Sequence, residues 1–166
     1  MPVSTDMGRL TSSSFQLSIP LLPGQTSLGA IAELRLNIFG TIIPSLTLEA
    51  IEGRWQSNKM LFQSGGITFE PWEISFVVDS QLKNWRVLFE WITLINNNID
   101  IPGKVPNDYM VDCSLKVSDN YNTVMVALKF RNVWIQSLGQ ISLNQREGDL
   151  ILESTATLYY DYIEVE

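Results

Sequence analysis

The segment ITFEPWEISFVVDSQLKNWRVLFEWITLINN, from Ile67 to Asn97, changes its hydrophobic period from two to 3.6 part-way along and so decides the fold. Its first half alternates apolar with polar residues, and the apolar positions are Trp72, Ile74, Phe76 and Val78. Successive side chains of a strand point to opposite faces. This half therefore predicts a strand with one buried face.

The second half of the segment predicts a helix. Asp79 or Ser80 can cap its start, and the pattern runs to about Ile95, before three consecutive asparagines. One apolar face is formed by Leu82, Trp85, Leu88, Phe89, Ile92 and Ile95, and Val87, Trp91 and Leu94 extend it. The apolar arc covers roughly 240°, whereas packing on one side needs only ~100°. The helix is thus expected either to sink deeply into its own domain or to pack on its own sheet and on a neighbouring subunit.

Strand patterns continue outward on both sides of this segment. Apolar and polar residues alternate over residues 32–38, which predicts a half-buried strand. Residues 45–66 combine strand-like pieces with a polar centre, and this pattern predicts a long hairpin or excursion. Gly65-Gly66 is interpreted as a turn. Residues 109–117 and 124–130 alternate on either side of a short turn and predict a second hairpin. Residues 150–162 predict one long final strand.

Strands outnumber the single helix, and no βαβ alternation is visible. We therefore predict a mainly β fold, an antiparallel β-sandwich or small barrel with one flanking α-helix at about 80–95. Residues 1–14 are polar, and residues 15–30 contain Pro20, Pro23, Gly24 and Gly29. The expected organisation is an N-terminal arm and loop over 1–30, followed by one domain over 31–166.

Composition narrows the possible functions. Charged residues make up 17% of the chain against about 25% in ordinary domains, which suggests apolar surface that faces other chains. The net charge of −7 does not supply the basic patch that non-specific DNA binding requires. An acidic wall would instead repel a polyanion and let it slide. The first residues lack a signal-peptide pattern and no long apolar run follows, so we expect neither export nor a membrane span.

The sequence offers little for catalysis. It contains no histidine, which excludes Ser-His-Asp, Cys-His and His-based metal sites. Cys113 lies in an apolar alternation and is interpreted as a core residue. The carboxylate pairs Glu70/Glu73 and Asp161/Glu164 are the remaining candidates for acid–base work, and nothing assigns their roles. We expect no enzyme activity and no cofactor or metal.

The five tryptophans raise the alternative of a carbohydrate-binding module. Trp72, Trp85 and Trp134 sit in apolar patterns, where core packing is the default. Trp55 has polar neighbours and could bind a sugar or contact another subunit.

Two blocks resemble the tail tube proteins of contractile-tailed bacteriophages. In residues 67–97, a T-F-x-x-W strand start runs into a helix that ends in an aromatic pair, carried by Thr68, Phe69, Trp72, Phe89 and Trp91. In residues 129–166, a V-W step, an L-G-x-I-x-L turn and a final aromatic and acidic strand are carried by Asn132, Val133, Trp134, Leu138, Gly139, Ile141, Leu143, Tyr160 and Tyr162. The likeness spans about residues 31–166.

The resemblance implies a structural virion protein that stacks as hexameric rings and forms the conduit for DNA ejection inside a contractile sheath. Six chains at −7 each would give the ring a charge of −42. The implied partners are further copies of itself, the sheath, baseplate and tail-terminator proteins, and phage DNA that passes without specific binding. The implied location is the virion tail, after synthesis in the host cytoplasm. A baseplate component or tube initiator of the same fold stays open as an alternative, with a sugar-binding sandwich and a glycosidase as more remote ones.

Ring formation requires surfaces that meet other copies. We expect the helix and the last strand to serve contacts within a ring, and the N-terminal arm and the 45–66 excursion to serve contacts between rings. The candidate interface residues are Val87, Trp91, Leu94, Trp55, Tyr159 and Ile163.

Overall fold

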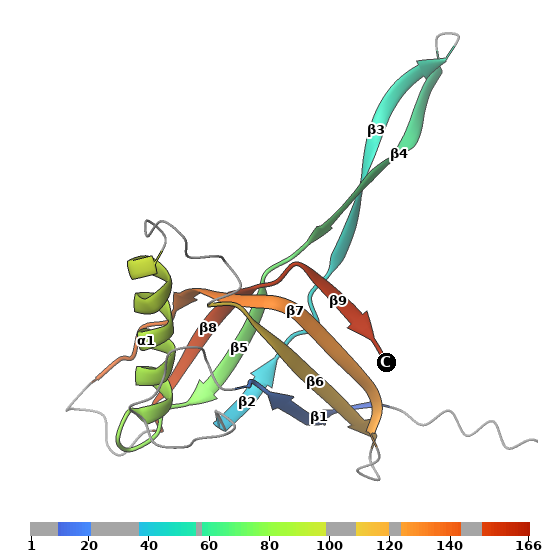
Figure 1. The fold of residues 1–166 in the computed structure, drawn as a ribbon. Helices are drawn as coiled ribbons and strands as arrows, with labels where there is room; N and C mark the ends of the chain where they lie inside the picture. Colours follow the sequence, from blue (N-terminus) through green and yellow to red (C-terminus); the bar gives the residue numbers. More distant parts are fainter. Residues whose placement is uncertain (1–9, 21–36, 56–57, 99–108, 120–123, 144–150) are drawn as a thin grey trace, which may run out of the picture.

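The computed structural model describes residues 10–20, 37–55, 58–98, 109–119, 124–143 and 151–166, and these are mostly strand (Figure 1). The elements in chain order are β1 (Leu10–Ser18), β2 (Asn37–Thr41), β3 (Leu46–Trp55), β4 (Asn58–Phe69), β5 (Trp72–Val77), α1 (Lys83–Asn98), β6 (Val111–Asp119), β7 (Val124–Leu138), β8 (Glu153–Tyr159) and β9 (Tyr162–Val165). The predicted mainly β class with one helix is confirmed for this part of the chain.

One sheet of seven strands forms the body of the molecule. Its order is β1-β6-β7-β8-β5-β2, with β9 also paired to β7, and every pair is antiparallel. The long strand β7 changes partners along its length, because β9 pairs with residues 128–131 and β8 with residues 134–138. Asn132 lies at this change with a φ of 55°, a left-handed conformation that asparagine tolerates better than most residues. The path of strands is open in the described residues, so the sheet bends without closing into a barrel.

The alternating strand predicted at the start of the deciding segment forms β5, at the centre of the core. Trp72, Ile74 and Phe76 are fully buried, and the residues between them are exposed or half-buried. The Trp72 ring stacks on Phe130 of β7, with centroids 4.0 Å apart and planes within 2°. The Trp72 indole Nε1 donates to the Thr41 hydroxyl at 2.9 Å, which gives the buried N–H an acceptor. The second predicted hairpin is also confirmed, since β6 and β7 pair.

The helix begins later and ends later than the sequence predicts. A turn precedes it, in which Leu82 has a φ of 55° and its carbonyl accepts the N–H of Arg86. The start is fixed by buried Asn84: its Nδ2 donates to the Val77 carbonyl at 2.7 Å, and its Oδ1 accepts the Asp79 N–H at 3.1 Å. Asp79 therefore belongs to the turn and does not cap the first helical residue. The asparagines at the end remain helical.

The predicted excursion over residues 45–66 is a long twisted hairpin of β3 and β4, which form a separate two-stranded sheet and project from the body (Figure 1). The interpretation of Gly65-Gly66 as a turn is wrong. Both glycines lie inside β4, opposite an irregularity in the pairing between Leu48 and Ala50. Extra residues in one strand of an antiparallel pair are accommodated by such bulges, and glycine is suited to them.

The predicted N-terminal arm is wrong for residues 10–20. β1 pairs with β6 at the edge of the sheet, and Ile19 is buried in the core. The polar composition of β1 did not prevent pairing, because backbone groups make the ladder of hydrogen bonds. Residues 1–9 and 21–30 of the predicted arm, and most of the strand predicted at 32–38, lie outside the described residues.

The single long strand predicted at residues 150–162 is two strands. β8 pairs with β5 and β7, whereas β9 pairs with the other half of β7 after a bend at Asp161. Ala156, Leu158 and Tyr160 are buried as the alternation predicts. The bend separates the two strands because β7 itself turns at Asn132, where its neighbours change.

Candidate assembly surfaces

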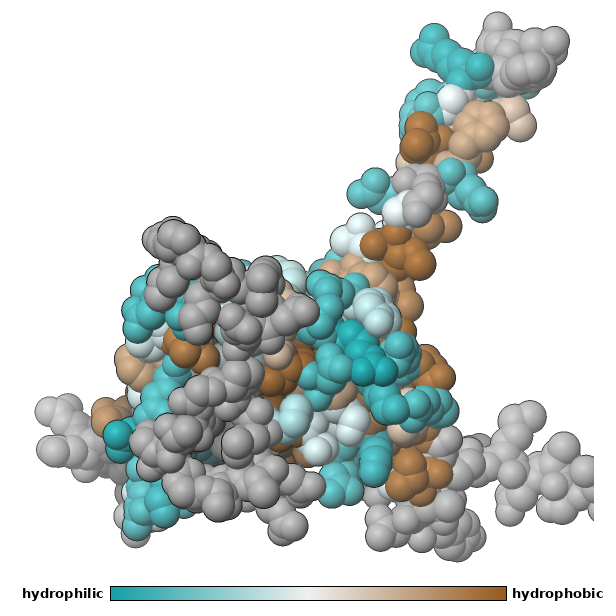
Figure 2. Space-filling view, viewed as in Figure 1, coloured by the Kyte–Doolittle hydropathy of each residue, from teal (hydrophilic) through white to brown (hydrophobic). Residues whose placement is uncertain are grey.

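The projecting hairpin carries seven of the exposed large apolar residues of the described chain, more than any other described element, and apolar side chains are visible along it in Figure 2. Paired residues on two antiparallel strands share a face, so the register assigns each side chain to one of two faces. Near the base, the apolar side chains are Leu46, Leu48 and Ile67, all exposed and on one face. Beyond the irregularity, most exposed apolar residues lie on the opposite face, called here the tip face, which consists of Ile51, Gly53, Met60 and Phe62. Leu61 remains on the first face.

The tip face has a defined local structure. A Cβ built on Gly53 would lie 2.5 Å from the Phe62 ring, so the ring lies directly across the glycine. Ile51 is the cross-strand partner of Phe62. Aromatic rings that cover a glycine in this way restore packing that the missing side chain leaves out. The other face near the tip carries Glu52, Arg54 and Lys59, with an ion pair between Lys59 and Glu52 of 3.5 Å.

The base of the hairpin is fastened to the core by Tyr160. Its hydroxyl donates to the Glu70 carbonyl at 3.1 Å, and the Phe69 ring packs against its ring at 5.6 Å and 65°. Tyr160 in turn packs edge-on against Phe130, at 5.1 Å and 84°. Burial raises the pKa of the Tyr160 phenol, and the nearby Glu70 carboxylate adds to this effect. The hydroxyl thus stays protonated and able to donate.

Replacing Tyr160 with phenylalanine is expected to lower the free energy of unfolding by about 1 kcal/mol, because the Glu70 carbonyl loses its donor while the ring contacts remain. Hydrogen–deuterium exchange of residues at the hairpin base should increase in this variant. Chemical denaturation measures the first effect and peptide-resolved exchange the second. Unchanged exchange at the base would contradict the anchoring role. Tyr159→Phe is the matched control.

Two of the six residues predicted at subunit interfaces are wrong, because they lie in the chain's own core. Val87 and Trp91 are 3% and 0% exposed, and the Trp91 Nε1 donates to the Tyr109 carbonyl at 2.8 Å. The helix turns these residues and Leu88 inward and leaves Phe89 exposed, and Leu82 in the preceding turn is exposed as well. Phe89 and Leu82 therefore depart from the apolar face that the sequence predicts, whereas Leu88 follows it.

The other interface predictions stay predictions. Leu94, Tyr159 and Ile163 are half-buried, and Tyr159 stacks on Trp134 with centroids 5.3 Å apart. Trp55 ends β3, and its side chain lies outside the described residues. The structure therefore does not bring the six predicted residues together on one surface. Sequence reasoning missed the tip face, although the alternation Ile51, Gly53 and Met60, Phe62 could have indicated it.

Three residues considered for chemistry have structural roles instead, namely Cys113, Asp161 and Glu164. Cys113 is buried, and burial raises the pKa of its thiol well above the usual range, so the nucleophilic thiolate is suppressed. Asp161 accepts from Asn132 Nδ2 at 2.5 Å, and Glu164 pairs with Arg131. Within the described residues no three His, Cys, Asp or Glu side chains gather as a metal site, and no helix has the length and apolar character of a membrane span.

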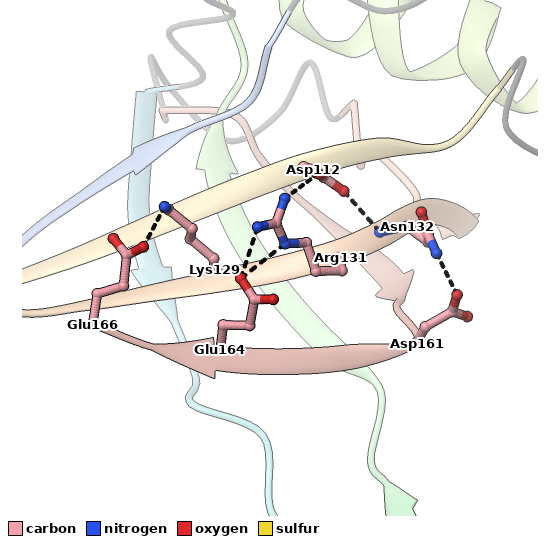
Figure 3. A network of polar contacts seen from close by, with 7 residues as sticks. All are labelled: Asp112, Lys129, Arg131, Asn132, Asp161, Glu164 and Glu166. Atoms are coloured by element: carbon pink, nitrogen blue, oxygen red, sulfur yellow. Dashed lines mark hydrogen bonds and ion pairs between the residues drawn. The ribbon is translucent and has the colours of Figure 1, made fainter.

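Charged and polar side chains form a network that joins β7 to its two neighbours β6 and β9 (Figure 3). Arg131 stands at its centre, with Nη1 2.6 Å from Asp112 Oδ2 and Nη2 2.7 Å from Glu164 Oε2. These partners raise the pKa of Arg131, Glu164 most strongly. The Asn132 backbone N–H donates to Asp112 Oδ1 at 3.0 Å and is the main cause that lowers the pKa of Asp112, which Arg131 lowers further. Asp112 therefore remains ionised in the folded chain.

No protein-family model matches the sequence. The chain is 31% identical over 111 residues to the tail tube terminator protein of Enterobacteria phage T4. The match covers 63% of this chain, and the chain spans 61% of that relative's length. A chain in the structure of the tube-terminating cap of the anti-feeding prophage superposes with a TM-score of 0.64 at 16% identity, covering 100% of this chain and 94% of the other.

The fold is that of tail tube proteins. A chain in the sheath and tube terminator structure of an extracellular contractile injection system superposes with a TM-score of 0.63 at 16% identity, covering 95% of this chain and 96% of the other. A chain of an Hcp protein superposes with a TM-score of 0.54 at 10% identity, covering 92% and 91%. The resemblance to the tail tube family inferred from residues 67–97 and 129–166 is confirmed at this level.

Proposed function

We propose that this chain is a structural component of a contractile tail tube, of the terminator type, and forms a ring that seats on the end of the tube. The relative of 31% identity is a tail tube terminator, which supports a place at the end of the tube over a place along it. The superposed chains come from tube-terminating and tube-bearing particles, in agreement with this placement.

The observation that carries the proposal is the apolar hairpin. A two-stranded sheet in water is marginally stable, and this one places Ile51, Met60 and Phe62 in solvent. Exposed apolar patches on a soluble domain mark surfaces that meet another protein. A hairpin that projects from the body can reach a neighbouring subunit, where its tip face would be covered (Figure 1).

Hexameric rings that stack along the tube, as the sequence resemblance implies, remain the alternative for the same surfaces. The two roles differ in what the purified chain does by itself. A terminator adds one ring and stops, whereas a tube subunit adds rings repeatedly, because a heterologous contact that does not close generates a filament.

Negative-stain electron microscopy with size-exclusion chromatography, over a concentration series of the full chain, separates these roles. Discrete rings with a central hole, at all concentrations, support the terminator. Tubes that lengthen with concentration support the stacking subunit. A monomer throughout the series contradicts ring formation by this chain alone.

Replacing Phe62 with serine is expected to shift ring formation to about tenfold higher concentration, because it removes an exposed aromatic contact from the tip face. Leu61→Ser is the matched control. Leu61 is even more exposed, at 73% against 51% for Phe62, but lies on the opposite, charged face. Equal effects of the two substitutions on assembly, measured by size exclusion, would contradict a specific role for the tip face.

A further inference from the structure

The last strand, β9, is attached to the body differently from the other strands. It has four residues, Tyr162–Val165, follows the bend at Asp161, and pairs only with β7 among the described strands. Its other edge carries no described strand. β8, immediately before it, pairs on both sides.

Apolar packing contributes little to holding β9. Tyr162 is 45% exposed and Val165 71% exposed, and Ile163 alone packs partly against the core. In β8, by comparison, alternate residues are buried along the whole strand. Removing β9 would therefore uncover little of the hydrophobic core.

β9 is held by its backbone hydrogen bonds with β7, and charge contacts between side chains add to them (Figure 3). Glu164 accepts from Arg131 Nε at 3.0 Å and from Nη2 at 2.7 Å, and Glu166, next to the strand, pairs with Lys129. Asp161 at the bend accepts from Asn132. Asp112 of β6 shares Arg131 with Glu164, so Arg131 has a second anionic partner that does not belong to β9.

We propose that β9 is a detachable strap that covers the edge of β7 at residues 128–131 and is held by its backbone ladder with β7 together with these ion pairs. Its release leaves β7 paired to β6 and the core closed, and exposes the backbone N–H and C=O groups of β7 at residues 128–131 to solvent. Ion pairs at the surface weaken as salt rises, so the strap opens more often at high ionic strength. This inference does not depend on the proposed place in a tail.

Hydrogen–deuterium exchange by mass spectrometry on the full chain tests the strap, in about 50 mM and about 1 M sodium chloride, where the screening length falls to ~3 Å. In the native chain, exchange of the C-terminal peptide over residues 162–166 is expected to rise about tenfold with salt, while peptides of β5 and β8 stay protected. Arg131→Gln should raise the same exchange at low salt and abolish most of its salt dependence. Glu52→Gln, which removes an ion pair on the hairpin, is the control and should leave residues 162–166 unchanged.

Three results would overturn the proposal. The C-terminal peptide could exchange only together with β5 and β8, which would mean that β9 opens only when the core unfolds. It could be insensitive to salt in the native chain, which would remove the role of the ion pairs. It could also exchange at the rate of an unstructured peptide at low salt, which would mean that the strap is not closed. The salt comparison on the native chain decides the question even if Arg131→Gln fails to fold.

Discussion

Replacing Trp72 with alanine is expected to lower the free energy of unfolding by about 3–5 kcal/mol, a large part of the total stability of about 5–15 kcal/mol of an ordinary domain. The side chain is fully buried and stacks on Phe130, so its removal opens a cavity under the centre of the sheet. It also removes the donor to Thr41. The substitution also removes the ring that stacks on Phe130, and Phe130 packs against Tyr160, which anchors the hairpin.

Chemical denaturation followed by circular dichroism measures this effect, with Trp134→Ala as the matched control. Trp134 is half-buried and stacks on Tyr159, so its removal is expected to cost less than half as much as the loss of Trp72. If both substitutions cost the same, the central position assigned to Trp72 would be wrong.

Replacing Gly139 with alanine is expected to lower the free energy of unfolding by about 2–3 kcal/mol, because a methyl group there overpacks the junction of β7 and β8. A Cβ at Gly139 would lie 2.5 Å from the Thr155 Oγ1 and 2.9 Å from the Thr155 carbonyl oxygen, which is backbone and cannot rotate away. The Gly139 N–H also donates to that carbonyl at 2.6 Å, and the Ser154 hydroxyl donates to the Gly139 carbonyl. The two strands must move apart to admit the methyl group.

Gly40→Ala is the control for Gly139, because Gly40 lies within the strand β2 and has space for a side chain. A Cβ at Gly40 would meet only the Ser75 side chain, at 3.5 Å, which is an ordinary contact. This substitution is expected to change stability by less than about 1 kcal/mol, with the loss of freedom in the unfolded chain favouring alanine. Thermal unfolding of both variants checks the difference, and a Gly139 variant as stable as Gly40→Ala would show that the junction is not closely packed.

Patterns of period two predicted the parts of the fold that depend on local alternation. Trp72, Ile74 and Phe76 are buried as the sequence indicates, and the two hairpins and the single helix are present. A strand buries one face wherever it packs, so alternation reveals which residues point inward without knowledge of the partner. Gly139, which the sequence resemblance placed in a turn, lies directly against Thr155 of β8.

The rotation of the helix about its axis, and thus the face that packs on the core, could not be predicted from its sequence. Because apolar residues cover most of its circumference, several rotations bury a similar hydrophobic area. The side chain of Asn84 selects one of these rotations, because its hydrogen bonds to Val77 and Asp79 fix the start of the helix next to β5. Val87 and Trp91 consequently point inward, and Phe89 points out.

The sequence by itself determined the secondary-structure class, the buried alternation around Trp72 and the long hairpin, because each depends on the spacing of neighbouring residues. The tertiary structure alone decided that a polar segment joins the sheet as β1, that the last strand divides at Asp161, and that the apolar tip face is presented to solvent. These features depend on which strand lies alongside. Neighbouring strands are joined by backbone hydrogen bonds, which every residue except proline can donate, and by side-chain contacts between residues about 30 positions apart, such as the Arg131–Glu164 ion pair and the Asn132–Asp161 hydrogen bond. Such contacts leave no period in the sequence.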